Sequence, residues 1–210
     1  MSQRITGLYQ LTQIPFVYSL FQNMLGADRS RRELVSTYIR PQPGERVLDF
    51  GCGPGTIFPY LGEVASYTGI DLNGDHIETA KAQYGDKAIF HCGSLETLEK
   101  DVSGPFDLAV CVGVLHHLDD SVVDSLCQLV ADRLTPQGRF VTIDPAFVEG
   151  QHWFARWLAS KDSGQAVRSP EGYTQRLKLA FQSVNVSVRH NMLRVPYTHC
   201  IIDSRKSPTE

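Results

Sequence analysis

The 210-residue sequence has no run of apolar residues close to the ~18 that a membrane-spanning helix needs. It also lacks an excess of either charge, because 20 Lys and Arg residues stand against 23 Asp and Glu residues. Proteins that bind nucleic acid through its phosphates usually carry a basic face, so this balance disfavours that class. No apolar stretch follows the N-terminal residues 1–4, and a signal peptide is not expected. These absences predict a cytoplasmic protein with no nucleic-acid partner and no membrane span.

Cysteine occurs without the spacing of a metal or disulfide motif. The five cysteines are Cys52, Cys92, Cys111, Cys127 and Cys200. No two are spaced Cys-x-x-Cys and the count is odd, which disfavours both a disulfide framework and a zinc site. We therefore expect reduced, mostly buried thiols.

From about residue 45, short apolar runs alternate with helical patterns. The runs with the length and composition of buried strands are residues 46–50, 66–71, 87–91, 106–112 and 139–144. Between them, residues 74–84 and 121–134 repeat apolar side chains at three- and four-residue spacing, which predicts helices. Strands that alternate with helices form a parallel sheet covered on both faces.

The segments on either side of this core have different patterns. Ser169 and Pro170 resemble an N-cap and a first helical residue, and they predict a helix to about Phe181. Residues 183–189 and 193–202 then alternate like strands around a short link, which predicts an antiparallel hairpin. We expect a single domain with four parts: an N-terminal helical cap (1–40), a core (44–145), a helical insertion (145–170), and a helix with the hairpin (170–204).

A glycine-rich turn follows the first predicted strand. Gly51, Gly53 and Gly55 allow the backbone to turn sharply and to approach a ligand that a β-carbon would block. A dinucleotide motif would have its third glycine where Thr56 stands, and a P-loop would have Lys-Ser or Lys-Thr after the glycines. Neither is present, so the turn indicates a nucleotide-type ligand without a closely held phosphate.

Two carboxylates accompany the turn. Asp71 ends the second predicted strand, where it could accept hydrogen bonds from both ribose hydroxyls, or simply cap the next helix. Asp49 precedes the first glycine, where it would repel a phosphate but attract an ammonium or a sulfonium. The expected ligand is therefore cationic and free of phosphate, which describes S-adenosylmethionine.

Four ordered motifs carry a family resemblance. They are Val47–Thr56, Gly69–Asn73, Phe106–Leu118 and Leu134–Phe140. With them the chain resembles the class I S-adenosylmethionine-dependent methyltransferases of the small-molecule, methyltransferase-11/12-like kind. The resemblance implies a Rossmann-like α/β fold: a seven-stranded, mostly parallel sheet with a C-terminal antiparallel hairpin and helices on both faces.

The resemblance also implies which residues contact the cofactor. These are Asp49, Gly51, Cys52, Gly53, Asp71, Leu72, Ser94, Leu95, Val112 and His117. The glycines would pass under the methionine portion, with Asp49 and the carbonyl of Val112 near its ammonium. Leu72 would pack on the adenine, and Ser94 would border the adenine edge, where the family often has an aspartate.

Methyl transfer needs alignment of nucleophile, methyl and sulfur, and for a hydroxyl or protonated amine it also needs a base. His117 follows the fourth predicted strand, at the sheet edge where ligands bind, and it is our candidate base. The alternative is that His116 and His117 only shape the cofactor pocket. Adjacent histidines rarely chelate one metal because their side chains diverge, so we expect no metal site.

Acceptor specificity is expected outside the shared core, from an aromatic-rich group of residues. Its members are Tyr9, Tyr18, Phe147, His152, Trp153, Trp157, Tyr173, His190, Tyr197 and His199. The fourth motif lacks Asn/Asp-Pro-Pro-Tyr, which disfavours nucleobase amines and glutamine amides, and the Cys-x-x-x-Cys-x-x-Cys of radical S-adenosylmethionine enzymes is absent. The chain is expected to methylate an O, N, C or S atom of a small molecule, release S-adenosylhomocysteine, and act as a monomer or homodimer.

Two alternatives stay open at this point. The first is methylation of a macromolecule such as tRNA or a protein side chain. A basic face that would support it could be built from Arg29, Arg31, Arg32, Arg156, Lys161 and Arg168. The second is an S-adenosylmethionine-binding protein without turnover.

Overall fold

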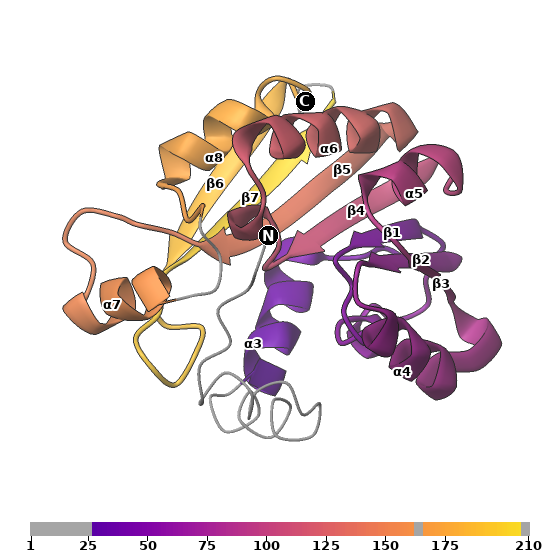
Figure 1. Ribbon diagram of the computed structural model, residues 1–210, viewed down its shortest axis with the longest axis horizontal. Coiled ribbons are helices and arrows are strands. Elements are labelled where there is room, and N and C mark those ends of the chain that lie inside the picture. Colours follow the sequence, from indigo (N-terminus) through magenta and orange to yellow (C-terminus); the bar gives the residue numbers. More distant parts are fainter. Residues whose placement is uncertain (1–26, 162–165, 207–210) are drawn as a thin grey trace.

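The computed structural model describes residues 27–161 and 166–206 and contains one seven-stranded sheet in the order β3-β2-β1-β4-β5-β7-β6 (Figure 1). The strands are β1 (Arg46–Phe50), β2 (Ser66–Asp71), β3 (Ile89–Cys92), β4 (Phe106–Val112), β5 (Leu134–Pro145), β6 (Ser183–Arg189) and β7 (His199–Arg205). Strands β1 to β5 are parallel, and β7 runs antiparallel between β5 and β6. The predicted mostly parallel sheet with a reversed C-terminal hairpin is confirmed.

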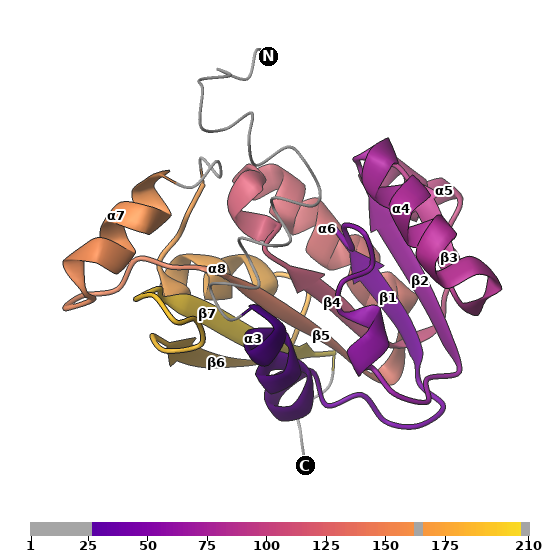
Figure 2. The ribbon, with the colours of Figure 1, turned by 90° about the horizontal axis from the view of Figure 1, so that it is seen from below.

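Helices cover both faces of this sheet. They are α3 (Ala27–Glu33), the π-helix η1 (Leu34–Ile39), the 3₁₀ turns η2 (Phe58–Tyr60), η3 (Gly85–Lys87) and η4 (Leu115–His117), and the α-helices α4 (Gly74–Tyr84), α5 (Leu95–Lys100), α6 (Asp120–Arg133), α7 (Trp153–Lys161) and α8 (Pro170–Leu177). Buried residues of η1 and α4 pack on one face, and those of α5, α6 and α8 pack on the other (Figures 1 and 2). The helix α7 lies apart from these layers, beyond the end of β5 (Figure 1).

The apolar pattern of the strands explains this two-sided burial. Along β1, Val47 joins the cluster under η1 and α4, whereas Leu48 joins the cluster under α6 and α8. Successive side chains of a strand point to opposite faces, so a continuous apolar run fits a strand that is covered on both sides. The predicted thiols follow the same rule: all five cysteines are free, and four are buried.

The N-terminal cap is tied to the sheet by a buried arginine. Within the predicted helical cap, residues 27–39 are helical, and residues 1–26 lie outside the described part. The guanidinium of Arg139 on β5 donates to the carbonyls of Tyr38 at 3.4 Å and of Arg40 at 2.7 Å. These carbonyls end η1, where no further helical turn can satisfy them. Arg139 therefore fixes the end of the cap against β5.

The link of the C-terminal hairpin is longer than predicted. The second strand starts at His199 rather than at Leu193, so residues 190–198 connect β6 to β7. The reason is Pro196, which has no N–H to donate. Because β7 pairs on both sides, a proline inside it would break a ladder that both neighbours need.

The third strand spans residues 89–92 rather than 87–91, and two further boundaries differ from the expectation. The helix that opens at Ser169 and Pro170 ends at Leu177 instead of Phe181, because the N–H of Ala180 donates to Leu177 and tightens the chain toward β6. The fifth strand begins at Leu134 rather than Arg139, with an irregularity in its pairing to β4 that absorbs the predicted turn at residues 136–138. Neither change moves the carboxyl end of a strand.

Candidate active site

The order of the strands reverses between β1 and β4. In open α/β sheets, ligands bind beyond the carboxyl ends of the strands at such a switch point. Here the glycine turn follows β1, and Gly113 and the histidine turn η4 follow β4. Asp144, near the end of β5, lies next to them because β5 pairs with β4. The candidate site is built from these three strand ends.

The first two glycines of the turn are required for different reasons. A β-carbon on Gly51 would lie 2.2 Å from Cγ2 of Val114, so the turn after β1 packs directly on the turn after β4. A β-carbon on Gly53 would point into open space, with only Nδ1 of His76 at 4.0 Å. Both residues have positive φ, +79° and +55°. Gly51 therefore closes the gap between the two turns, whereas Gly53 leaves a bare backbone surface for a ligand.

Asp49 is buried beneath this turn. Its side chain is only 2% exposed and accepts a hydrogen bond of 2.5 Å from the Tyr67 hydroxyl. Burial raises the pKa of Asp49 to about 7, the Tyr67 hydrogen bond opposes the rise, and the nearby Asp71 carboxylate adds to it. A cation bound above the turn would relieve this cost by stabilising the ionised form.

Asp71 is held in place by backbone donors. Its carboxylate accepts hydrogen bonds of 2.8 Å from the N–H groups of Gly53 and Asn73, and Nδ1 of His76 lies 3.5 Å away. Burial alone would raise the pKa of Asp71, but His76 and the two backbone donors outweigh it and hold that pKa below its usual range. Asp71 is therefore an ionised acceptor with a fixed orientation, as ribose binding requires.

An exposed apolar side chain lies next to Asp71. Leu72 is 76% exposed, which is unusual for leucine, and it follows directly on the ribose-binding candidate. Ser94 and Leu95 follow β3, the strand that pairs with β2. Ser94 is exposed, and as the N-cap of α5 its hydroxyl accepts a hydrogen bond from the N–H of Glu96, while Leu95 is half-buried. The predicted adenine region thus offers an apolar surface at Leu72 and a hydroxyl that is partly engaged in capping.

The two histidines of η4 have different environments. His116 is 4% exposed, and its Nδ1 lies 2.8 Å from Oδ1 of Asp144, which also accepts the backbone N–H of His116 at 3.1 Å. His117 is exposed, and its ring lies against that of His116 with centroids 4.0 Å apart. Burial raises the pKa of Asp144, and its contact with His116 opposes that rise.

Sequence reasoning did not single out Asp144. It ends the fifth predicted strand, so the signal that could have found it is its place at the same sheet edge as the histidines. The predicted cofactor residues Asp49, Gly51, Cys52 and Gly53 lie around the β1 turn, with Asp71 and Val112 at neighbouring strand ends. Leu72, Ser94 and Leu95 extend this edge beyond β2 and β3.

The aromatic group proposed for acceptor specificity separates into core and surface members. Tyr173 is buried, and its hydroxyl donates to the carbonyl of Pro145, so it belongs to the core. Trp153 and Trp157, one turn apart on α7, are 73% and 49% exposed. His199 is half-buried beside Tyr197, and the burial of its ring lowers the pKa of His199 to about 4. Tyr9 and Tyr18 lie outside the described residues.

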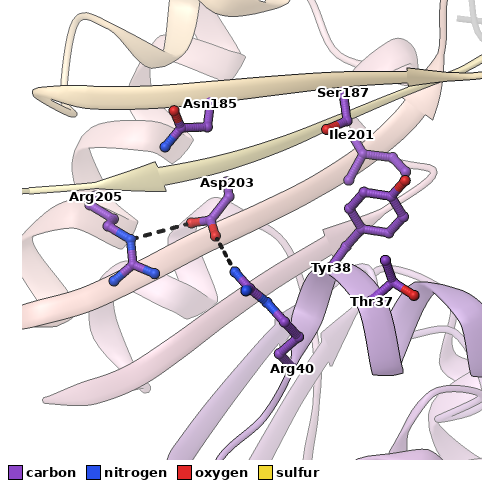
Figure 3. A pocket seen from close by; sticks show the side chains of 8 residues that line it. All are labelled: Thr37, Tyr38, Arg40, Asn185, Ser187, Ile201, Asp203 and Arg205. Carbon is purple, nitrogen blue, oxygen red and sulfur yellow. Dashed lines mark ion pairs between the residues drawn. The ribbon is translucent and has the colours of Figure 1, made fainter. Parts of the chain in front are cut away.

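A cavity lined by two arginines lies elsewhere in the fold. It has a volume of about 280 Å³ and is lined by Thr37, Tyr38, Arg40, Asn185, Ser187, Ile201, Asp203 and Arg205 (Figure 3). Asp203 lies between the guanidinium groups, at 3.5 Å from Arg40 and 3.8 Å from Arg205. In the β5–β7 ladder, Arg205 lies opposite Arg139, at the other end of β5 from Asp144. This cavity is therefore separate from the candidate site.

Two further features of the described chain bear on the site. Within residues 27–161 and 166–206, no three His, Cys, Asp or Glu side chains converge as metal ligands would. In the same residues, no helix is both long enough and apolar enough to cross a bilayer. The site itself offers two carboxylates and a bare glycine backbone, and these groups fit a cationic ligand with ribose hydroxyls.

Comparisons with known proteins agree with this geometry. Residues 47–138 match the family described as a methyltransferase domain. A ubiquinone biosynthesis O-methyltransferase of Aromatoleum aromaticum is 34% identical over 41% of this chain and 40% of its own length. A ribosomal RNA small subunit methyltransferase C of Chromohalobacter salexigens is 28% identical over 62% of this chain and 39% of its own length. The chain thus spans about two fifths of the length of these curated relatives.

A solved structure shares the fold over almost the whole chain. The mitomycin 7-O-methyltransferase MmcR superposes with a TM-score of 0.67 and 20% identity, covering 95% of this chain and 61% of that one. The four ordered motifs and the domain match cover nearly the same residues, and the strand order extends the same fold to the C-terminal hairpin. Residues 47–138 therefore match a methyltransferase domain, and the described chain has the fold of the class I S-adenosylmethionine-dependent methyltransferases.

Proposed function

We propose that this chain transfers the methyl group of S-adenosylmethionine to a small-molecule acceptor and releases S-adenosylhomocysteine. The observation that carries the proposal is the pair of carboxylates at the ends of β1 and β2, the buried Asp49 and the oriented Asp71, next to the bare backbone at Gly53. Such a site favours a ligand that combines positive charge with ribose hydroxyls, and it repels a phosphate.

Different residues of the chain contact the methionine, ribose and adenine portions of the cofactor. Gly51, Cys52 and Gly53 provide the backbone floor for the methionine portion. Asp49 and the carbonyl of Val112 face the ammonium, and Asp71 accepts the ribose hydroxyls. Leu72, Ser94 and Leu95 border the adenine. S-adenosylmethionine supplies an electrophilic methyl group on a positively charged sulfur.

The protein's part in the reaction is alignment, exclusion of water and, for a hydroxyl acceptor, removal of a proton. His117 is the proposed proton acceptor because it is exposed at the end of β4, beside the cofactor turn. The buried pair of His116 and Asp144 fixes the turn on which His117 lies. The aromatic surface of α7, which follows β5, is the proposed contact for a planar acceptor.

The macromolecular alternative is favoured by one observation, the similarity to a ribosomal RNA methyltransferase. Two arginines of the basic face that this alternative requires contact other side chains of the protein. Arg168 pairs with Asp120 at 2.7 Å, and Arg156 lies over the ring of Phe147 at 5.0 Å. The names of other similar proteins, a ubiquinone biosynthesis O-methyltransferase and a mitomycin 7-O-methyltransferase, favour a small acceptor. We therefore propose a small molecule with a hydroxyl group as the first acceptor to test. A cytoplasmic location and a monomeric or homodimeric state belong to the same proposal.

Calorimetry with S-adenosylmethionine and S-adenosylhomocysteine tests the donor side, and binding of both is expected. If neither binds, the proposal fails, and binding without any transfer would favour the non-catalytic alternative. For the acceptor, methyl-labelled S-adenosylmethionine is incubated with a metabolite extract and, separately, with total RNA. Label in the small-molecule fraction supports the proposal, whereas label only in RNA overturns its acceptor class.

A further inference from the structure

Arg168 lies just before α8 and reaches across to the histidine turn. Its side chain is only 10% exposed, and its guanidinium donates to the carbonyls of Leu115 at 2.9 Å and Leu118 at 2.7 Å. It also donates to the carbonyl of Ala166 at 3.0 Å and to the Asp120 carboxylate at 2.7 and 2.9 Å. Leu115 and Leu118 flank the two histidines, so one side chain holds both ends of η4.

The segment around Arg168 also contacts the middle of the turn. The N–H of Ala166 donates to the carbonyl of His116 at 3.0 Å. Three carbonyls of the turn, those of Leu115, His116 and Leu118, therefore accept hydrogen bonds from residues 166–168. A 3₁₀ turn this short leaves most of its carbonyls without internal partners, and buried carbonyls need donors.

The same arginine is tied to the end of β5. Its backbone N–H donates to the Tyr173 hydroxyl at 3.4 Å, and that hydroxyl donates to the carbonyl of Pro145 at 3.0 Å. Its carbonyl accepts the N–H of Phe147 at 3.1 Å. Arg168 thus joins the turn that carries His116 to the strand end that carries Asp144, and it closes the base of the insertion that contains α7.

We propose that Arg168 is a positioning residue, which sets the orientation of the His116 and His117 rings relative to the end of β5 and to the insertion. This inference rests on the proposed function, because it assigns a role within the same site. Arginine suits the position because its planar, always charged fork can serve three carbonyls and a carboxylate at once. A lysine ammonium has no such fixed geometry.

A nearby ion pair provides the matched control. Arg176 on α8 donates to Asp124 on α6 at 2.9 Å, and both side chains are partly exposed. This pair joins the same two helices that begin next to the turn, but it makes no contact with η4 among its hydrogen bonds. Loss of Arg176 removes an inter-helix ion pair of the same type without removing donors from the turn.

The test uses the full chain saturated with S-adenosylhomocysteine and labelled at the Cε1 carbons of histidine. Ring signals are recorded over a pH titration for the wild type, R168M, R168K and R176M, and are assigned with H116Q and H117Q. We expect both His116 and His117 signals to shift, and their titration midpoints to change, in R168M. His76 on α4 and His91 on the edge strand β3, which no hydrogen bond of Arg168 reaches, should stay unchanged, and R168K should recover only part of the difference.

The result for R176M decides between positioning and general stability. If R176M leaves both ring signals in place while R168M and R168K move them, the inference stands. If R168M leaves them in place, or if R176M moves them equally, it is overturned. Should R168M fail to fold, R168K against R176M gives the same decision. Failure of the wild type to bind S-adenosylhomocysteine would instead overturn the proposed function, which separates the two failures.

Discussion

The backbone N–H of Gly53 donates a 2.8 Å hydrogen bond to the carboxylate of Asp71, 18 residues further along the chain. The bond joins the turn after β1 to the end of β2, so the floor for the methionine portion and the acceptor for the ribose form one unit. The N–H of Asn73 holds the same carboxylate from the other side. Ligand binding therefore meets a carboxylate that is already oriented.

Replacing Asp71 should weaken cofactor binding with little effect on the fold. Hydrogen bonds to a charged group contribute about 1.5–3 kcal/mol each, so D71N should lower the affinity for S-adenosylhomocysteine by about tenfold to a hundredfold. D75N, which removes an exposed carboxylate in the first turn of α4, should change the affinity by no more than about fivefold, because a surface charge contributes ~0.2–1 kcal/mol. Calorimetry of both variants measures this, and equal affinities would remove Asp71 from the ribose site.

Asp49 should make stability depend on pH. Its pKa of about 7 in the folded protein exceeds the ordinary value of 3.8, so the native state keeps a proton that the unfolded chain releases. Its contribution to stability is complete below the unfolded pKa and is lost as the pH rises through the folded pKa. D49N removes this loss, so it should stabilise the protein relative to the wild type at pH ~8 by up to about 4 kcal/mol, and much less at pH ~4. Urea unfolding at both pH values tests this, and a difference independent of pH would contradict it.

The same carboxylate should link cofactor binding to pH. A ligand ammonium favours ionised Asp49, so the wild-type affinity for S-adenosylhomocysteine should rise between pH ~6 and ~8. The D49N variant serves as the reference, because the ligand's own titration is the same for both proteins. Calorimetry across this range should show a smaller rise for D49N, and parallel curves would place the ammonium away from Asp49.

The two glycines of the turn should separate stability from binding. G51A places a β-carbon against Val114 in a left-handed backbone, and overpacking with this strain should cost about 2–4 kcal/mol. The double variant G51A/V114A should recover part of that loss. G53A should cost no more than the control G62A, where φ is also positive and nothing lies within 4 Å, yet only G53A should weaken S-adenosylhomocysteine binding. Thermal unfolding and calorimetry distinguish these outcomes.

The neighbouring histidines should fail in different ways. H117Q should retain stability but lose about a hundredfold or more in kcat with a hydroxyl acceptor, the contribution usual for a general base. H116Q should lose stability by about 1–3 kcal/mol, because Asp144 is left buried without its ring partner. Single-turnover methyl transfer and urea unfolding provide the comparison. A fully active H117Q would assign proton removal to another group.

Much of the fold could be predicted because local patterns and tertiary structure agree. The runs at 46–50 and 66–71 became β1 and β2 with the same bounds, since each is apolar and ends at the turn residues that follow it. The start of β7 could not be predicted from alternation alone, because residues 193–198 alternate as a strand does. Pro196 excludes them only once it is known that β7 lies inside the sheet.

The candidate site was predictable to the extent that it lies in the motifs. Asp49, the glycines and Asp71 are close in sequence to the turns that position them. The partnership of His116 with Asp144, and that of Arg168 with Leu115, join residues 28 and 53 positions apart. Only the pairing of β4 with β5, and the return of the chain into α8, bring these groups together, and no local pattern encodes either.

The helix α7 has a consequence for spectroscopy. The chain has two tryptophans, Trp153 and Trp157, and both are exposed on this helix, with Trp157 stacked on Phe154 at 5.6 Å between centroids. Their emission therefore reports on the insertion alone, and the glycine turn has no tryptophan near it in the sequence. Binding of an acceptor against α7 should change this emission, whereas binding of S-adenosylmethionine at the glycine turn should leave it unchanged.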